Sequence, residues 1–370
     1  MSNASYLIAI STQSSNPKTE TQRTKPILDF SDGCIMTATH YLGMLGSLLL
    51  MAVVVAVGPY SSADMFAPDQ GPGWYYWKLQ DPDFMSRFTS WGLYSLHQVA
   101  IWGTIAYAQI QRPKYSKTLN PVNIAALGLN VLFILLHILQ TKVWYDGLAQ
   151  DTPVWSSQAS VVFMLVFVLM MENSRRGLFF GKKIEFVDKP TDFLKRYHGY
   201  YFSWAVIYTF WFHPIEDNLG HMLGTFYVIM LMLQGSLMFT RYHMNRKWTL
   251  WLECFVLIHG SLVAYMTIEG DQWKMFFFGF LTLFVVTQMH GIGLGNKTRT
   301  AIVLAYIGGV IAAYYGNWGD MAAIIRIPFA EYGFVFLFAA IAWLPVGLGR
   351  LVKFRKAKPE EPIPTNVSNA

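Results

Sequence analysis

Long apolar stretches separated by short polar segments run along most of the chain. A helix needs about 20 mostly apolar residues to cross the hydrocarbon core of a bilayer. Ten stretches meet or approach this length, and together they predict an all-α bundle of about ten transmembrane helices. The ten stretches are Met36–Gly58, Phe88–Gln109, Pro121–Thr141, Pro153–Met171, Tyr197–His213, Leu219–Thr240, Trp248–Thr267, Trp273–His290, Thr300–Tyr315 and Phe329–Gly349.

Lysine and arginine residues gather in alternate connections, as cytoplasmic loops of membrane proteins do. They follow every even-numbered stretch, for example as Arg112, Lys114 and Lys117 after the second. The opposite connections are short and mostly acidic, apart from 60–87, which is rich in tryptophan, tyrosine and aspartate. This alternation predicts that both termini of the chain are cytoplasmic.

The composition supports a membrane protein and excludes several other classes. Only 14% of the 370 residues are charged and 54% are hydrophobic, whereas soluble domains carry about 25% charged residues. The net charge of +6 reflects the basic loops and does not indicate a nucleic-acid partner. Two cysteines, Cys34 and Cys254, are too few for a disulfide framework or a cysteine-rich metal site.

Three regions are expected along the chain: a polar cytoplasmic segment at 1–35, a transmembrane domain at 36–350, and a disordered cytoplasmic tail at 351–370. The first region has no basic stretch leading into a short apolar core and a small-residue cleavage site, so no removable signal peptide is expected. The protein is predicted to reside in a plasma membrane or a bacterial inner membrane, in contact with membrane lipids.

Histidines are concentrated in the predicted outer half of the membrane. By the helical rise, His97 and His259 lie about 14 Å and about 12 Å from the outer ends of their helices. The full outer set is His97, His137, His213, His221 and His259. Neutral imidazole is the commonest biological metal ligand and suits iron and copper. A single membrane histidine more often hydrogen-bonds a neighbouring helix, so the metal site is predicted from the coincidence in depth.

Two acidic residues, Glu216 and Asp217, lie in the tight turn between His213 and His221. They are candidates for the catalytic groups of this site, as a further ligand or a proton acceptor. Asp146, beyond the third stretch, is expected to approach the same region.

Three further histidines, His40, His198 and His290, lie near the predicted inner ends of their helices. Histidines at both depths are compatible with two b-type haems that pass electrons across the membrane, with these three as candidate cofactor ligands. Covalent c-type haem is excluded because no Cys-x-x-Cys-His segment occurs.

These observations predict a metal- or haem-dependent membrane oxidoreductase that acts on a lipophilic small molecule or takes electrons from a donor. The alternative is a five-plus-five inverted-repeat transporter, in which Glu253 and the histidines carry protons or bind substrate. An accessory subunit of a membrane complex is the third reading. For Glu253 itself, an interhelical hydrogen-bond cluster is favoured over a proton relay. The sequence leaves the substrate, the metal and the oligomeric state open.

Overall fold

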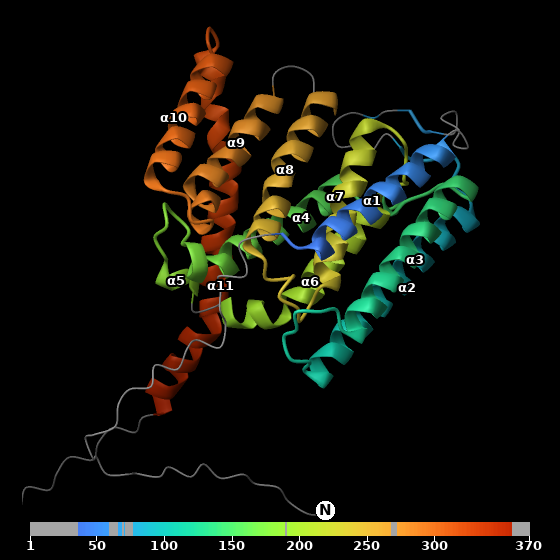
Figure 1. Ribbon diagram of the computed structural model, residues 1–370, viewed down its shortest axis with the longest axis horizontal. Coiled ribbons are helices and arrows are strands. Elements are labelled where there is room, and N and C mark those ends of the chain that lie inside the picture. The colour runs from blue at the N-terminus through green and yellow to red at the C-terminus, as the bar shows by residue number, and fades with distance from the viewer. Residues whose placement is uncertain are drawn as a thin grey trace, which may run out of the picture. The chain divides into compact units, whose positions relative to one another are not determined.

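The computed structural model describes residues 36–58, 66–68, 70, 77–188, 191–267 and 272–356, with side chains as far as residue 344 (Figure 1). These residues form helices and isolated β-bridges and no strand, which confirms the all-α class for this part of the chain. The predicted N-terminal segment at 1–35 and the end of the predicted tail at 357–370 lie outside the described residues. The final helix continues to Lys356, inside the region predicted as tail.

Every predicted apolar stretch coincides with a helix, and one short helix, α5, was not predicted. The helices are α1 Ala38–Val57, α2 Phe84–Gln111, α3 Pro121–Val143, α4 Val154–Arg176, α5 Glu185–Asp188, α6 Thr191–Phe212, α7 Leu219–Ser236, α8 Arg246–Thr267, α9 Trp273–Val286, α10 Asn296–Ala313 and α11 Arg326–Lys356. Three 3₁₀ helices join them: η4 Leu148–Gln150, η5 Gln288–Gly291 and η6 Trp318–Ile325.

The helix ends differ from prediction where polar side chains hold the backbone. α6 starts at Thr191, six residues before the predicted Tyr197. The Thr191 hydroxyl donates a hydrogen bond to the Asp188 carbonyl at 2.6 Å and holds the backbone where the helix begins. α9 ends at Val286, before the predicted His290, and the hydroxyl of the next residue, Thr287, donates to the carbonyl of Leu178.

Six helical segments of the described chain are long and apolar enough to cross a membrane: Ala38–Val57, Pro121–Val143, Val154–Arg176, Leu219–Ser236, Arg246–Met266 and Trp318–Leu344. They indicate a membrane protein. The other predicted crossings, at α2, α6, α9 and α10, form helices that are shorter or more polar, so the number ten stays a prediction.

The exposed surface of α1 is apolar, whereas its buried positions include polar side chains. Leu42 and Leu49 are 67% and 61% exposed, while Ser47 is 3% exposed and His40 is fully buried. Water would penalise such a surface, but lipid does not, and the helix interior satisfies its own backbone hydrogen bonds. This inside-out distribution is what a lipid-facing helix requires.

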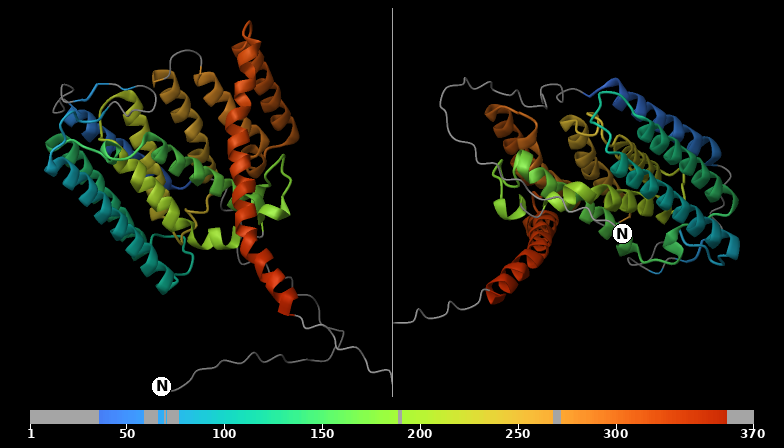
Figure 2. Two further views of the ribbon diagram at one scale, coloured as in Figure 1. Left: turned by 180° about the vertical axis from the view of Figure 1, so that it is seen from behind. Right: turned by 90° about the horizontal axis from the view of Figure 1, so that it is seen from below.

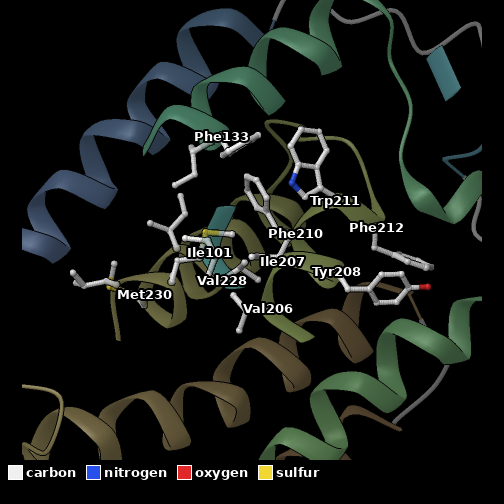
Figure 3. Close-up of a cluster of buried hydrophobic side chains, with 14 of the residues drawn as sticks. Ile101, Phe133, Val206, Ile207, Tyr208, Phe210, Trp211, Phe212, Val228 and Met230 are labelled. Carbon is white, nitrogen blue, oxygen red and sulfur yellow. The ribbon is translucent and has the colours of Figure 1, made fainter. Parts of the chain in front are cut away.

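The helices α6 and α7 lie among the others. α6 packs against α2, α4 and α7, and α7 packs against α1, α3 and α8 (Figures 1 and 2). Farther along, α8 pairs with α9, and α11 packs against both α9 and α4. The largest apolar cluster of the described residues surrounds α6, and Figure 3 shows Phe210 and Trp211 from that helix facing Phe133 of α3.

Candidate histidine site at the α6–α7 turn

His97 lies in a chain of hydrogen bonds that joins four helices. The indole Nε1 of Trp211 donates to Nδ1 of His97 at 3.2 Å, so Nδ1 accepts and Nε2 carries the proton. Nε2 lies 2.9 Å from the Asn130 side-chain oxygen. The Asn130 amide then donates to the Ser236 hydroxyl at 2.9 Å, and that hydroxyl donates to the Met232 carbonyl at 2.8 Å.

Both ring nitrogens of His97 are therefore occupied by protein groups, although the ring is fully buried as the metal prediction required. The ring also stacks on Phe133, with centroids 4.4 Å apart and an interplanar angle of 8°. A metal ion could bind His97 only by displacing Asn130 or Trp211.

His137 is held in a similar way beneath the α6–α7 turn. Its Nε2 lies 3.1 Å from each of two backbone carbonyl oxygens, those of Phe210 and His213, so this nitrogen donates. In the neutral ring Nδ1 then accepts, and its neighbour at 3.2 Å is the Gln140 amide. Turning that amide over places its otherwise unpaired NH₂ group against Nδ1.

His213, His221 and His259 form a second group, which we call the histidine triad. The rings of His213 and His221 stack, with centroids 4.8 Å apart and an interplanar angle of 12°. The Cε1 atom of His259 of α8 lies against Gly224 of α7, one helical turn after His221, where an added Cβ would come within 2.9 Å. The glycine therefore makes room for this ring.

The triad has donor atoms that suit a transition metal. The Nδ1 atom of His259 is buried and has no hydrogen-bond partner among the described residues. His213 lies directly after the end of α6, and a neutral imidazole at this position is the form that a metal ligand requires. Within the described chain, however, no three histidine, cysteine or acidic side chains are arranged closely enough to hold a metal ion.

The two predicted acidic residues of the turn have separate surroundings. Glu216 is 4% exposed and forms an ion pair with Lys142, with Oε2 and Nζ 3.6 Å apart. Asp217 is exposed, and its carboxylate lies against Gly58 at the end of α1. Neither forms a close group with the triad that could ligate a metal in the described residues.

Asp146 does approach the histidine region, as predicted. The neighbouring Gly147 packs so closely on the backbone of Phe212 and His213 that an added Cβ would lie 2.5 Å from the Phe212 oxygen. Asp146 is 2% exposed, and its Oδ1 accepts a hydrogen bond from the Gly147 amide at 2.7 Å. Burial raises the pKa of this carboxyl group to about 7.

The three inner histidines, His40, His198 and His290, are not joined by any contact found among the described residues. His40 Nε2 lies 3.1 Å from the Tyr242 carbonyl oxygen. The His198 ring lies 6.1 Å from that of His243. His290 belongs to η5, with its Nε2 3.2 Å from the Val285 carbonyl oxygen.

Glu253 of α8 belongs to a buried ion pair. Both of its carboxylate oxygens accept from the Arg176 guanidinium at the end of α4, at 3.1 and 2.6 Å. The Gln288 amide donates to the same carboxylate at 3.3 Å. The expected hydrogen-bond cluster is thus present, but its main partner is a charged arginine. We call this group the arginine–glutamate centre.

Comparison with known proteins adds no functional assignment, because no family model, curated protein or solved structure matches the chain. The polar partners that the sequence analysis missed are Asn130, Trp211 and Arg176. Asn130 was detectable as a polar residue within an apolar stretch, but Arg176 was hidden in a basic segment whose lysines, Lys182 and Lys183, are exposed.

Proposed function

We propose that the protein is an integral membrane protein with ten crossings and both termini on the cytoplasmic side. The support is the set of apolar helices together with the alternation of basic and acidic connections along the sequence.

We further propose that it is a membrane oxidoreductase that uses iron, copper or haem b, with the histidine triad as the ligand set. One observation carries this proposal: the His213 and His221 rings stack, His259 of α8 lies against Gly224 of α7, and the buried Nδ1 of His259 has no hydrogen-bond partner among the described residues. A bound iron or copper would supply one-electron chemistry.

The roles of this chain's own residues differ from those first expected. His213, His221 and His259 would bind the metal after the stacked rings turn apart. His97 and His137 would orient Trp211 and the turn, because their ring nitrogens are engaged with protein groups. Asp146, with a pKa of about 7, would hold or release a proton beside the triad.

The experiment is metal analysis and a visible absorption spectrum of the purified protein, followed by titration with iron, copper or haem. We expect stoichiometric binding that His259→Ala and His221→Ala reduce at least tenfold. The matched control is His290→Ala, a histidine of η5 outside the triad, which should bind as the wild type does. A protein that stays metal-free and haem-free after titration would overturn the proposal.

A proton-coupled transporter is the second candidate, favoured by the continuous hydrogen-bond chain from Trp211 through His97 and Asn130 to Ser236. Vesicles containing the protein and a pH-sensitive dye distinguish it from the first. Substrate-dependent proton uptake without bound metal would support the transporter, and bound metal without proton uptake would support the oxidoreductase.

A further inference from the structure

An apolar groove runs between α2 and α3 next to their basic connection. It has a volume of about 460 Å³ and is lined by Ala100, Gly103, Thr104, Tyr107, Pro121, Val122 and Ala125. Most of these residues are small, so the two helices leave room between them for a slender apolar group. An added Cβ at Gly103 would meet no atom within 4 Å, which confirms that the space is open.

The groove ends at a cluster of positive charge. Arg112, Lys114 and Lys117 lie in the connection between the helices, shortly after Tyr107 and before Pro121, and all three are exposed. The connection 112–120 contains no aspartate or glutamate. Arg112 and Lys114 form no ion pair with any described residue.

The basic connection is held in place by the neighbouring connection, 237–245, which also lacks acidic residues. The Ser116 amide donates to the Phe239 carbonyl at 3.2 Å, and the Arg241 amide donates to the Ser116 carbonyl at 2.9 Å. The Tyr242 hydroxyl donates to the Lys117 carbonyl at 2.5 Å. These bonds bring Arg241 beside the cluster and fix the backbone that presents the cations.

We infer that this groove and cluster bind an anionic phospholipid, with an acyl chain between α2 and α3 and the phosphate at Arg112 and Lys114. The apolar groove suits the acyl chain of the lipid, and the positive charge of the basic cluster complements the negative charge of the headgroup. Each Lys or Arg near an anionic membrane surface contributes about 1 kcal/mol, or about fivefold in affinity. The inference does not depend on the histidine triad.

The test is a titration of the detergent-solubilised full chain with dioleoyl-phosphatidylglycerol and dioleoyl-phosphatidylcholine, followed by native mass spectrometry. We expect phosphatidylglycerol to bind at least tenfold more tightly. Arg112→Gln combined with Lys114→Gln should weaken its binding about 25-fold. Lys182→Gln combined with Lys183→Gln, a pair of exposed cations on another connection, is the control and should change binding less than twofold.

The groove is tested separately from the charge. Gly103→Leu fills the open space and should weaken phosphatidylglycerol binding at least tenfold, although all the cations remain. Gly92→Leu is the matched control on the same face of α2, about 16 Å away, and its added Cβ also meets no atom.

Three results would overturn the inference: equal binding of both lipids, equal binding by the Gly103 variant and the wild type, or displacement of the lipid by millimolar inorganic phosphate. The first result would show that the cations do not recognise the headgroup. The second would show that the groove does not hold an acyl chain, and the third would identify a site for free phosphate. Circular dichroism and thermal midpoints of all variants establish that each is folded.

Discussion

Two buried polar clusters differ in how their polar groups are paired. One is the arginine–glutamate centre, and the other, the histidine region, comprises His97, His137 and the histidine triad. At the centre, Arg176 and Glu253 neutralise each other's full charge in a bidentate pair. In the histidine region, neutral rings are held by amides, an indole and backbone carbonyls. The arginine–glutamate centre therefore depends on both partners being present, whereas a single histidine can lose a hydrogen bond at lower cost. The centre is a structural ion pair in which both carboxylate oxygens are engaged, whereas the histidine region contains a buried ring nitrogen, Nδ1 of His259, without a hydrogen-bond partner among the described residues.

The largest effect is expected from breaking the charge pair. Glu253→Gln leaves the Arg176 guanidinium buried without its counter-charge, and loss of one partner of a buried pair costs about 3–5 kcal/mol. Thermal unfolding in detergent should report this loss. Replacing both residues by methionine should recover most of it, and Glu185→Gln, at an exposed acid, is the control. If the free energy of unfolding of the single variant falls by less than about 1 kcal/mol, the buried ion pair does not stabilise the fold as we describe.

The next effect depends on pH and concerns the acid beside the histidines. Burial raises the pKa of Asp146 to about 7 in the folded protein. The protonated carboxyl group therefore contributes fully to the free energy of unfolding below pH ~4, and this contribution is lost as the pH rises to ~7. The expected difference is about 4 kcal/mol at most. Asp146→Asn should remove this part of the pH dependence.

Thermal midpoints of wild type and the Asn variant, measured from pH 4 to 8, check the sign of that effect. The two proteins should coincide near pH 4 and the variant should be the more stable near pH 7. Asp320→Asn, at an exposed acid, should run parallel to the wild type. Parallel curves for the Asp146 variant would contradict a buried, protonated carboxyl group at this position.

The smallest of the three effects is expected within the neutral cluster. Asn130→Leu removes the partner of His97 Nε2, and an unpaired buried polar group costs about 1–3 kcal/mol. Combining it with His97→Phe should cost less than the sum of the two single changes, since no orphaned imidazole remains. Strict additivity in this cycle would mean that the two side chains are not coupled.

Much of the fold could be predicted from the sequence because lipid imposes simple rules on length and hydropathy. The apolar stretches located every long helix, including those at Pro121–Val143 and Val154–Arg176. The helix ends were less predictable. They depend on single side-chain bonds such as that of Thr287 with Leu178, which a pattern of apolar residues does not record.

The candidate site could be predicted only as a gathering of residues. Depth along each helix placed five histidines in one half of the membrane, and two of them, His213 and His221, stack on each other. It could not show which ring nitrogens are engaged, because that depends on the rotation of each helix about its axis. Asn130 and Trp211, on two other helices, form hydrogen bonds with the two ring nitrogens of His97. Nothing in the sequence around His97 indicates those partners.

The hydrogen-bond chain from Trp211 to the Met232 carbonyl has a mechanical consequence. Its donors all point in one direction and pass from α6 through α2 and α3 to α7. Sliding any one of these helices past its neighbours would break at least one link in a medium that offers no substitute. We therefore expect α2, α3, α6 and α7 to act as a fixed frame within the molecule.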